Sequence, residues 1–596
     1  MLRSRNTLRI EALERRELMA VVSGDFNGDG FQDVAYGEPD HNAAADIQSS
    51  GAVSIQYGTA EGLQSTTQAF DQDSPGVPGM AESGDQFGAA LAVGDFNGDG
   101  YDDLAVGAPD EDTSVSNNGA VHIFYGSFFG LETRYGLRLL TGHGRFGASL
   151  AVGRFNADGY DDLAIGAPSA NGGVDTPVLP DWADGHHEEA GRVLVYHGSR
   201  DGIGLVPNRR ISQEGDIKGN PEDNDHFGSA LAAGDFNGDG YDDLAVGTPG
   251  EDYSTFGLWE NKDNAGAVNI VNGSADGLVD DGNYLLVREN ELRDYEHFGG
   301  HLAAGDFNGD GISDLVVVSL GNVGTGDDSL AGIPVSEPGR AGAVGVYYGS
   351  SGKLGDVRSQ RFDDLGDYLA SASPLAVGDL NGDTIDDLVF ADPFENDLYE
   401  LHGGPGLLRS ARTWHTTTPG LEADRFNFHE ITAGDYNGDG TADIAIRAPK
   451  PVSSILSHVL VGSISNPPGL GGRYGRLQVI EGTDVLGLQV AGNYVVDLHG
   501  PGDGSGIVGL ANTATTGTAL SGMAVVEEDA QGAERLTDAA VVEKLYQQVL
   551  ARAPDEGGLK YHVERLEQGA PLSSVAAGIF ESPERLDPTI AGMYRD

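Results

Sequence analysis

The sequence predicts an all-β protein built from seven repeated units, and three observations support this fold class. A nine-residue acidic motif, Asp-x-Asn-x-Asp-Gly-x-x-Asp or a near variant, begins at positions 25, 95, 154, 235, 306, 379 and 435. Short apolar runs flank each copy, as expected where a glycine-rich turn joins two strands. Glycine supplies 91 of the 596 residues, about twice its usual share of about 7%, which indicates many tight turns.

The second copy shows the plan of one unit. Strands are expected on both sides of the acidic loop 95–103, at 91–94 and 104–107, and a third strand at 119–126 follows a gap whose length differs among the units. A weaker apolar segment at 137–140 supplies the fourth strand. Successive copies start about 68 residues apart on average, a length that suits four short strands and their loops.

Four-stranded units of this kind cannot bury both faces alone, so we expect them to stack radially as a seven-bladed β-propeller with calcium-binding hairpin loops. The propeller is placed at 21–481, after an Arg-rich leader at 1–20. The glycine-rich segment 482–530 is a linker, a closing strand of the ring or a degenerate eighth blade. Residues 531–596 are expected to form a small all-α module, either complete or truncated by the end of the chain.

The motifs beside the acidic loops resemble a known repeat. Phe-Gly precedes the loop at 87–88, 146–147, 227–228 and 298–299, and Gly-Ala-Pro or Gly-Thr-Pro follows it at 107–109, 166–168 and 247–249. These residues resemble the FG-GAP repeats of the integrin alpha-chain head, over residues 20 to about 481. The first unit lacks Phe-Gly, and the sixth has Tyr368-Leu369 and Ala391-Asp392-Pro393 instead. The resemblance implies a calcium-binding propeller that serves adhesion or recognition.

Both ends of the chain carry further resemblances. Residues 13–20 resemble the short leader of many large bacterial extracellular proteins, although a plain charged helical tail is the alternative. Near the other end, apolar residues fall at helical spacing: Val541, Val542, Leu545, Tyr546, Val549 and Leu550. Together with the turn at 553–558, this region resembles a small bacterial helical module of unknown function, similar to part of phycobilisome linkers. That resemblance implies attachment to a surface layer or cell wall, and a mere stability cap is the alternative.

The acidic loops have the composition of calcium sites. In the second copy, the side-chain oxygens of Asp95, Asn97, Asp99 and Asp103, with the carbonyl of Tyr101, are expected to surround one hard cation. Position 12 holds a strand residue in every copy, whereas an EF-hand needs a bidentate glutamate there. The candidate ligands in the six copies that begin with aspartate are Asp25, Asn27, Asp29, Asp33, Asp95, Asn97, Asp99, Asp103, Asp235, Asn237, Asp239, Asp243, Asp306, Asn308, Asp310, Asp314, Asp379, Asn381, Asp383, Asp387, Asp435, Asn437, Asp439 and Asp443.

Two copies depart from the pattern. The third begins with Arg154, and we expect its guanidinium to take the place of the cation near Asn156, Asp158 and Asp162, so that no calcium binds there. The sixth has Thr384 where the others have glycine, and a β-branched residue suits a positive φ poorly. We therefore expect about five or six Ca²⁺ ions, with weaker binding in the sixth loop. Their role is expected to be structural, because carboxylates that share a loop repel one another without a cation.

Ligand binding is expected on the face opposite the acidic loops, where the loops between the second and third strands lie. Two of these loops are long and aromatic, and they carry the candidate ligand-binding residues Trp182, His186, His187, Tyr253 and Trp259. Exposed aromatic side chains on loops bind sugars or peptides well. The alternative is that each tryptophan only packs against its own loop.

The composition and the absence of catalytic motifs argue against several classes of function. The chain has 35 Lys and Arg against 93 Asp and Glu, a net charge of −58, which argues against a nucleic-acid partner. No apolar run approaches the roughly 18 residues of a membrane span, so membrane insertion is not expected. The absence of cysteine removes thiolate catalysis. No nucleophile elbow, His-Glu-x-x-His motif or phosphate-binding loop occurs, so no catalytic residue is assigned and an enzyme is not expected.

These expectations combine into one functional hypothesis. We expect a secreted or cell-surface, calcium-stabilised adhesion or recognition protein whose ligand is a protein or a glycan. The alternative is an accessory or catalytic propeller of a polysaccharide-active hydrolase or lyase. Consumption of a carbohydrate, in contrast to its retention, would distinguish the two.

Overall fold

The structure is a computed structural model that describes residues 20–43, 47–60, 62–64, 67–112, 118–131, 133, 138–171, 187–213, 217–254, 261–287, 296–319, 343–355, 359–362, 375–392, 397–415, 430–438, 440–447, 474–480 and 493–499. The chain divides into two compact units, one of 1–482 with 495–510 and one of 483–494 with 511–596. The leader 1–19 and the predicted helical module 531–596 lie outside the described residues.

Six antiparallel four-stranded sheets account for most of the described residues. The first three sheets consist of β1 (Val21–Gly24), β2 (Asp33–Gly37), β3 (Val53–Gln56) and β4 (Thr67–Phe70); β5 (Ala90–Gly94), β6 (Asp103–Ala108), β7 (Ala120–Phe124) and β8 (Arg138–Thr141); and β9 (Ser149–Gly153), β10 (Asp162–Ala167), β11 (Arg192–Tyr196) and β12 (Arg209–Ile211). The fourth contains β13 (Ala230–Gly234), β14 (Asp243–Thr248), β17 (Ala267–Val271) and β18 (Tyr284–Leu286), with the small hairpin β15 (Tyr253–Ser254) and β16 (Asn261–Lys262) between its second and third strands.

The later sheets follow the same order. They consist of β19 (Phe298–Gly305), β20 (Asp314–Ser319), β21 (Ala343–Tyr347) and β22 (Ser359–Phe362); and β23 (Leu375–Gly378), β24 (Asp387–Asp392), β25 (Asp397–His402) and β26 (Arg409–His415). Two-stranded sheets are formed by β27 (Glu430–Gly434) with β28 (Asp443–Arg447) and by β29 (Tyr474–Ile480) with β30 (Asn493–His499). The described part of the chain contains strands and no helix.

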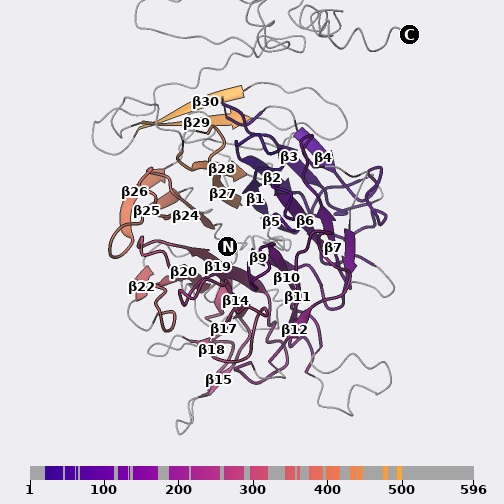
Figure 1. Ribbon diagram of the computed structural model, residues 1–596, viewed down its shortest axis with the longest axis vertical. Helices are drawn as coiled ribbons and strands as arrows, with labels where there is room; N and C mark the ends of the chain where they lie inside the picture. Colours follow the sequence, from indigo (N-terminus) through magenta and orange to yellow (C-terminus); the bar gives the residue numbers. More distant parts are fainter. Residues whose placement is uncertain are drawn as a thin grey trace, which may run out of the picture. The chain divides into compact units, whose positions relative to one another are not determined.

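The four-stranded sheets are the blades of a β-propeller. Their first strands contact one another in chain order, and β27 contacts both β23 and β1, so the ring is closed (Figure 1). The prediction of seven blades is wrong: the described residues contain six four-stranded blades, and the two-stranded sheet β27–β28 lies between the sixth blade and the first. The reason is that no described strand pairs with the outer side of β28, since β29 pairs with β30.

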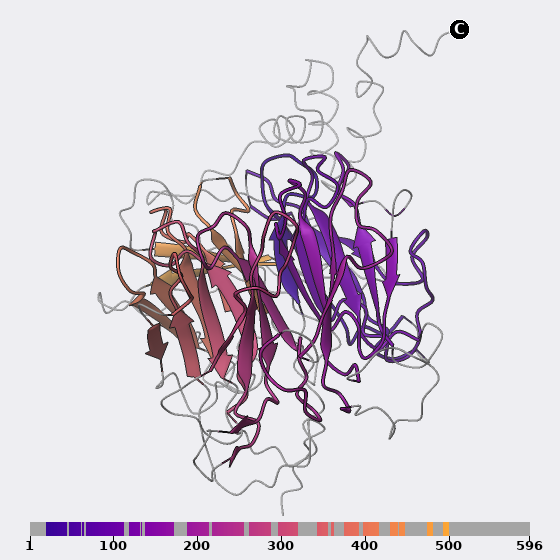
Figure 2. The same cartoon turned by 60° about the horizontal axis from the view of Figure 1, so that its bottom comes forward.

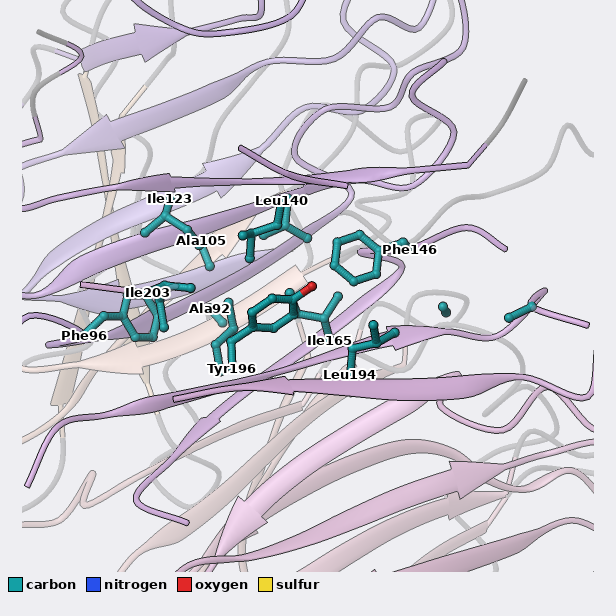
Figure 3. Packing of buried hydrophobic residues seen from close by; sticks show 14 residues of the cluster. Ala92, Phe96, Ala105, Ile123, Leu140, Phe146, Ile165, Leu194, Tyr196 and Ile203 are labelled. Carbon is teal, nitrogen blue, oxygen red and sulfur yellow. The ribbon is translucent and has the colours of Figure 1, made fainter. Parts of the chain in front are cut away.

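The apolar core lies between neighbouring blades, which Figure 2 shows side by side from a second direction. In one cluster, Ala105 and Ile123 of the second blade pack with Ile165 and Tyr196 of the third, and each is at most 2% exposed (Figure 3). Similar clusters join the other neighbouring blades. Each blade therefore depends on its neighbours for burial, as expected for a propeller.

The Gly-Ala-Pro motif has a steric explanation. A Cβ at Gly107 would lie 2.1 Å from the carbonyl oxygen of Gly147 in the next blade. Only glycine lets the two backbones approach so closely. The Phe-Gly motif supports the same contact, since the Phe146 ring is fully buried between the second and third blades.

Candidate metal-binding loops and the opposite face

Each acidic loop connects the first strand of a sheet to the second, and the six loops that begin with aspartate fold around the carboxylate of that residue. In the second loop, Asp95 Oδ1 accepts hydrogen bonds from the backbone N–H groups of Gly98 (2.7 Å) and Asp99 (3.1 Å), and Oδ2 accepts one from Gly100 (2.9 Å). Gly98 and Gly100 have φ angles of 71° and 89°, a region that glycine adopts easily. The glycines therefore shape the loop, as the sequence indicated.

The last aspartate of the loop is a buried bridge between backbone segments. Asp103 is fully buried, its Oδ2 accepts a hydrogen bond from Phe96 N–H (3.0 Å), and its Oδ1 accepts one from Gly126 N–H (2.9 Å) beyond the third strand. The residues in the same position that also accept from the glycine after the third strand are Asp33, Asp162, Asp243, Asp314 and Asp387. The sequence pattern predicted a metal ligand at this position and did not indicate its structural role.

Electrostatics within a loop favour a cation. Burial raises the pKa of Asp103 to about 8, and the carboxylates of Asp99 and Asp95 add to the rise. Likewise, burial raises the pKa of Asp314 to about 7, with contributions from Asp306 and Asp310. The oxygens of aspartate and asparagine are the ligands that hard cations take. A cation among them would relieve the mutual repulsion of the carboxylates.

The loops contain the oxygen atoms that calcium prefers as ligands, but these atoms do not surround a common point in the described structure. Within the described ranges, no three His, Asp or Glu side chains come together closely enough to hold a metal ion. Asn97 Oδ1 accepts a hydrogen bond from Asp99 N–H (2.9 Å), and Asp99 Oδ1 accepts one from Tyr101 N–H (3.1 Å). Backbone amides thus occupy the oxygens that calcium would take. Asp439 of the seventh loop lies outside the described residues.

The third loop differs from the expectation for Arg154. Its Nε donates to Asp161 Oδ1 at 2.8 Å, and two thirds of its side chain is exposed. The guanidinium therefore pairs with Asp161 and not with the expected group of Asn156, Asp158 and Asp162. Inside the loop, Asn156 Nδ2 donates to Asp162 Oδ2 at 3.1 Å.

The sixth loop keeps the backbone geometry of the others. Thr384 has a φ of 69°, and its N–H donates to Asp379 Oδ2 at 2.7 Å. A β-branched residue in this conformation carries strain of about 1–3 kcal/mol. The loop therefore forms in spite of the missing glycine.

The seven acidic loops are linked in a ring of hydrogen bonds. In each link, the backbone N–H of the eighth loop residue donates to the carbonyl oxygen of the first residue of the preceding loop. The seven donor and acceptor pairs are Asp102 to Asp25, Asp161 to Asp95, Asp242 to Arg154, Ser313 to Asp235, Asp386 to Asp306, Ala442 to Asp379 and Gln32 to Asp435. Four of these links contain a second hydrogen bond. In each of the four, the side-chain carboxylate of the eighth loop residue accepts a hydrogen bond from the backbone N–H of the same first residue. The loops thus form one continuous backbone assembly.

Of the five residues predicted to bind ligand, the structure describes the side chain of one. His187 Nδ1 lies 3.4 Å from Asp223 Oδ1, where the β10–β11 loop meets the segment before β13. The backbone of Tyr253 is in β15, opposite Lys262. Trp182, His186 and Trp259, and the side chain of Tyr253, lie outside the described residues.

A second acidic group was missed by the sequence analysis. Asp225 stands two residues before Phe-Gly in the fourth unit, and Glu251 stands two residues after its Gly-Thr-Pro. Both side chains are at most 5% exposed. The signal was present, since Asp85 and Glu111 hold the same places in the second unit and are also buried.

The described part of the chain has no helix that is long and apolar enough to cross a membrane. This finding accords with the lack of long apolar runs in the sequence.

Comparison with known families identifies the repeats. The FG-GAP repeat family matches residues 19–55, 87–124, 146–196 and 227–270, and the FG-GAP-like repeat family matches 379–446. The resemblance to FG-GAP repeats is therefore confirmed. Residues 523–587 match a domain of unknown function, DUF4214.

Comparison with individual proteins gives partial matches. The chain is 34% identical to integrin alpha-PS5 of Drosophila melanogaster over 171 residues, 28% of this chain and 15% of that protein. It is 32% identical to integrin alpha-PS2 of the same organism over 244 residues, 39% of this chain and 15% of that protein. It is 37% identical to phosphatidylinositol-glycan-specific phospholipase D of Rattus norvegicus over 158 residues, 26% of this chain and 18% of that protein. The chain thus spans less than a fifth of the length of these relatives.

Solved structures give only a weak likeness. A putative 6-phosphogluconolactonase from Bacteroides uniformis superposes with a TM-score of 0.35 at 12% identity, over 71% of this chain and 94% of that chain. The propeller with FG-GAP repeats thus rests on the family matches and on the sheets themselves.

Proposed function

We propose that this chain, which carries FG-GAP repeats and is similar over part of its length to integrin alpha chains, is a calcium-stabilised recognition protein. The proposal rests on one observation above all: the acidic loops form a closed ring on one face of the propeller. The loops on that face connect the blades to one another through these hydrogen bonds. The loops of the opposite face are therefore available to bind a protein or a glycan.

Calcium would act on the loops as a structural ion. The oxygens of the first, third and fifth loop residues, such as Asp95, Asn97 and Asp99, would hold it, with the carbonyl of Tyr101. A bound ion supplies positive charge among carboxylates that otherwise repel one another. We propose about five or six ions, held by the six loops that begin with aspartate, with the weakest binding in the sixth loop. Asp103 and its equivalents would then position the loop through their bonds to the backbone.

The proposed recognition surface is made by the loops between second and third strands. Their lengths vary between blades while the strands that carry them repeat, which is typical of binding loops on a rigid scaffold. His187 and Asp223 join two segments on this surface at the third and fourth blades. Trp182, His186, Tyr253 and Trp259 belong to the same loops in sequence, and we propose them as contacts to the ligand.

The remaining parts of the proposal concern location and attachment. We propose a secreted or cell-surface protein, with no nucleic-acid partner and no membrane insertion. We also propose that residues 531–596 form a C-terminal module like part of phycobilisome linkers, which would attach the propeller to a surface layer or cell wall. The similarity to integrin alpha chains supports an adhesive role, and the match of 523–587 to DUF4214 gives the attachment hypothesis a defined segment to delete.

We propose no catalytic role for the chain. The second candidate function is an accessory or catalytic propeller of a polysaccharide-active hydrolase or lyase. The similarity to phosphatidylinositol-glycan-specific phospholipase D favours this candidate in a general way, because it places related repeats in an enzyme.

A binding screen tests the proposal. The calcium-loaded full chain would be applied to arrays of bacterial surface glycans and proteins, and any bound carbohydrate would be recovered and sized. Retention of an intact glycan or protein that is lost in the Trp182→Ala and Trp259→Ala variants supports recognition. Shortened or unsaturated products would reject it in favour of the enzyme.

A further inference from the structure

A buried acidic group lies in the fourth blade, away from the acidic loops. Asp225 is fully buried, and its Oδ2 accepts a hydrogen bond from Glu222 N–H at 2.6 Å. Glu251 is 5% exposed, and its Oε2 accepts a hydrogen bond from Gln213 Nε2 at 2.5 Å. Gln213 comes after β12 of the third blade and Glu251 after β14 of the fourth, so the group joins two blades.

Several oxygens of this group have no hydrogen-bond partner among the described protein atoms. They are Asp225 Oδ1, Glu222 Oε2 and Gln213 Oε1. The Gln213 side chain is only 4% exposed, and its amide is held in the group by its bond to Glu251. A buried polar atom without a partner is costly, so three such atoms within one group of acidic and amide side chains indicate a missing ligand.

Asn269 adds a further unpartnered side chain. It is 1% exposed, and neither its Oδ1 nor its Nδ2 has a hydrogen-bond partner in the described structure. It lies on β17 opposite Val246 of β14. Strand β14 ends at Thr248, and Glu251 follows three residues later. We name Gln213, Glu222, Asp225, Glu251 and Asn269 the acid–amide cluster.

The second blade contains a related arrangement that shows where the Asn269 position points. His122 lies opposite Val106 as Asn269 lies opposite Val246. His122 Nε2 and Glu111 Oε1 are both 3.8 Å from the point where a Cβ would stand at Gly79, and Gln72 Nε2 is 3.3 Å from it. Gln72 Nε2 also donates to Glu111 Oε2 at 2.5 Å, as Gln213 does to Glu251. The strand residue, the glutamine and the glutamate therefore converge.

Within the described ranges, the acid–amide cluster holds more acidic groups than basic ones. Burial raises the pKa of Asp225 to about 8, and the carboxylates of Glu251 and Glu222 add to the rise. No lysine or arginine in the described ranges forms an ion pair with these three carboxylates, and His187 is the basic group that acts on Glu222. Buried carboxylates without a cation are costly unless they are neutralised.

We propose that the acid–amide cluster binds a hard divalent cation, with Ca²⁺ as the preferred ion, at the junction of the third and fourth blades. The available atoms are carboxylate and amide oxygens, which hard cations take in sets of about 6–8 at roughly 2.3–2.6 Å. No three acidic or histidine side chains converge in the described structure, so the amide oxygens of Gln213 and Asn269 complete the set. The cation would clamp the end of one blade to the next, and the site is separate from the acidic loops.

Ion counting on the full chain tests this site. Calcium bound after equilibrium dialysis would be measured by mass spectrometry for the wild type, Asp225→Asn and Glu251→Gln, and for Asp235→Asn as the matched change in the acidic loop of the same blade. We expect Asp225→Asn and Glu251→Gln each to remove one ion. Asp235→Asn would remove a different ion, so that Asp225→Asn with Asp235→Asn removes two.

Thermal unfolding provides a second readout. In chelator, Asp225→Asn should raise the unfolding temperature, because the amide avoids the cost of burying a carboxyl group beside the carboxylates of Glu222 and Glu251. In millimolar calcium it should lower that temperature relative to the wild type. If Asp225→Asn fails to fold, Asn269→Leu provides a second variant. Leucine suits this strand position, because Leu194 occupies it in the third blade, opposite Ile165. Asn269→Leu should lower the calcium-dependent rise in unfolding temperature.

An unchanged ion count in Asp225→Asn, Glu251→Gln and Asn269→Leu, with equal shifts of unfolding temperature with and without calcium, would overturn the site. That outcome is distinct from failure of the acidic loops, which would leave the count unchanged in Asp235→Asn. The two hypotheses are therefore decided separately.

Discussion

The backbone N–H of Gln32 donates a hydrogen bond to the carbonyl oxygen of Asp435 at 3.0 Å and thereby joins the first acidic loop to the last. Beside it, Ser23 Oγ donates to Ala433 O at 2.8 Å. These contacts close the ring at β1 and β27 although the last sheet has only two described strands. Ring closure thus depends on the inner hairpin and its acidic loop.

Removal of one loop ligand should remove one calcium ion. The Asp95→Asn variant loses the carboxylate around which the second loop folds, so a calorimetric titration of chelator-stripped protein should show one site fewer. For a Kd near 0.1 mM, millimolar calcium contributes about 1.4 kcal/mol per site, and the calcium-dependent gain in stability should fall by that amount. Asp158→Asn is the control, because its loop begins with Arg154. Equal ion counts in wild type and Asp95→Asn would contradict the assignment.

Loss of the buried loop aspartate should destabilise the protein even without calcium. Asp103→Ala leaves the N–H of Gly126 without an acceptor and leaves Phe96 N–H with only its bond to Gly94 O. Urea unfolding in chelator should therefore show a loss of about 1–3 kcal/mol, the cost of one unsatisfied buried donor. Asp99→Ala, in the exposed part of the same loop, should cost less than about 1 kcal/mol under the same conditions. A small effect of Asp103→Ala in chelator would mean that this residue acts through the metal alone.

The acidic motif predicted the local structure of the loops well and their tertiary contacts poorly. The pairing of Gly94 with Asp103 follows from the apolar runs on either side of a turn of fixed length. The bond from Gly126 to Asp103 joins the loop to the end of the third strand, and nothing in the nine-residue spacing specifies that contact. The blade count was overestimated for a similar reason, because the motif marks the inner hairpin of a blade and says nothing about its outer strands.

The contact between Gly107 and Gly147 should tolerate no side chain. A Cβ at Gly107 would lie 2.1 Å from the Gly147 carbonyl oxygen, and the neighbouring blade cannot yield easily. We expect Gly107→Ala to cost about 1–3 kcal/mol or more in thermal or urea unfolding. Gly404→Ala is the matched control, because its Cβ would meet nothing within 4 Å. Equal stability of the two variants would show that the blades can separate at this point.

His122 should make stability depend on pH in the acid range. Burial lowers the pKa of His122 to about 4, against a weaker opposing effect of its hydrogen bond to Pro78 O. Between about pH 4 and 6.5 the unfolded chain therefore binds a proton that the folded chain does not, so this group's contribution to stability is lost as pH falls through that window.

The variant His122→Asn isolates this contribution, because Asn269 has the same strand position in the fourth blade. The difference in free energy of unfolding between wild type and variant, measured by urea unfolding in chelator, should shift in favour of the variant as the pH falls from 6.5 to 4. The many acidic groups titrate in both proteins and largely cancel in that difference. A difference that stays constant over the range would mean that His122 is not held neutral by burial.

The third loop offers a gain of function. Arg154→Asp restores the missing first carboxylate, and it also releases Asp161 from its ion pair with Arg154. The fourth loop residue is Ala157, whereas the other loops have glycine there with φ near 70°, as at Gly98 and Gly238. Because an alanine avoids that region, Arg154→Asp alone should supply the carboxylate without the loop conformation that calcium binding needs.

The Arg154→Asp, Ala157→Gly double variant should bind one more calcium ion than the wild type in the calorimetric titration. If the double variant gains no ion, the first carboxylate and the glycine are insufficient to define the site, and the remaining loop assignments lose their basis in the repeated motif.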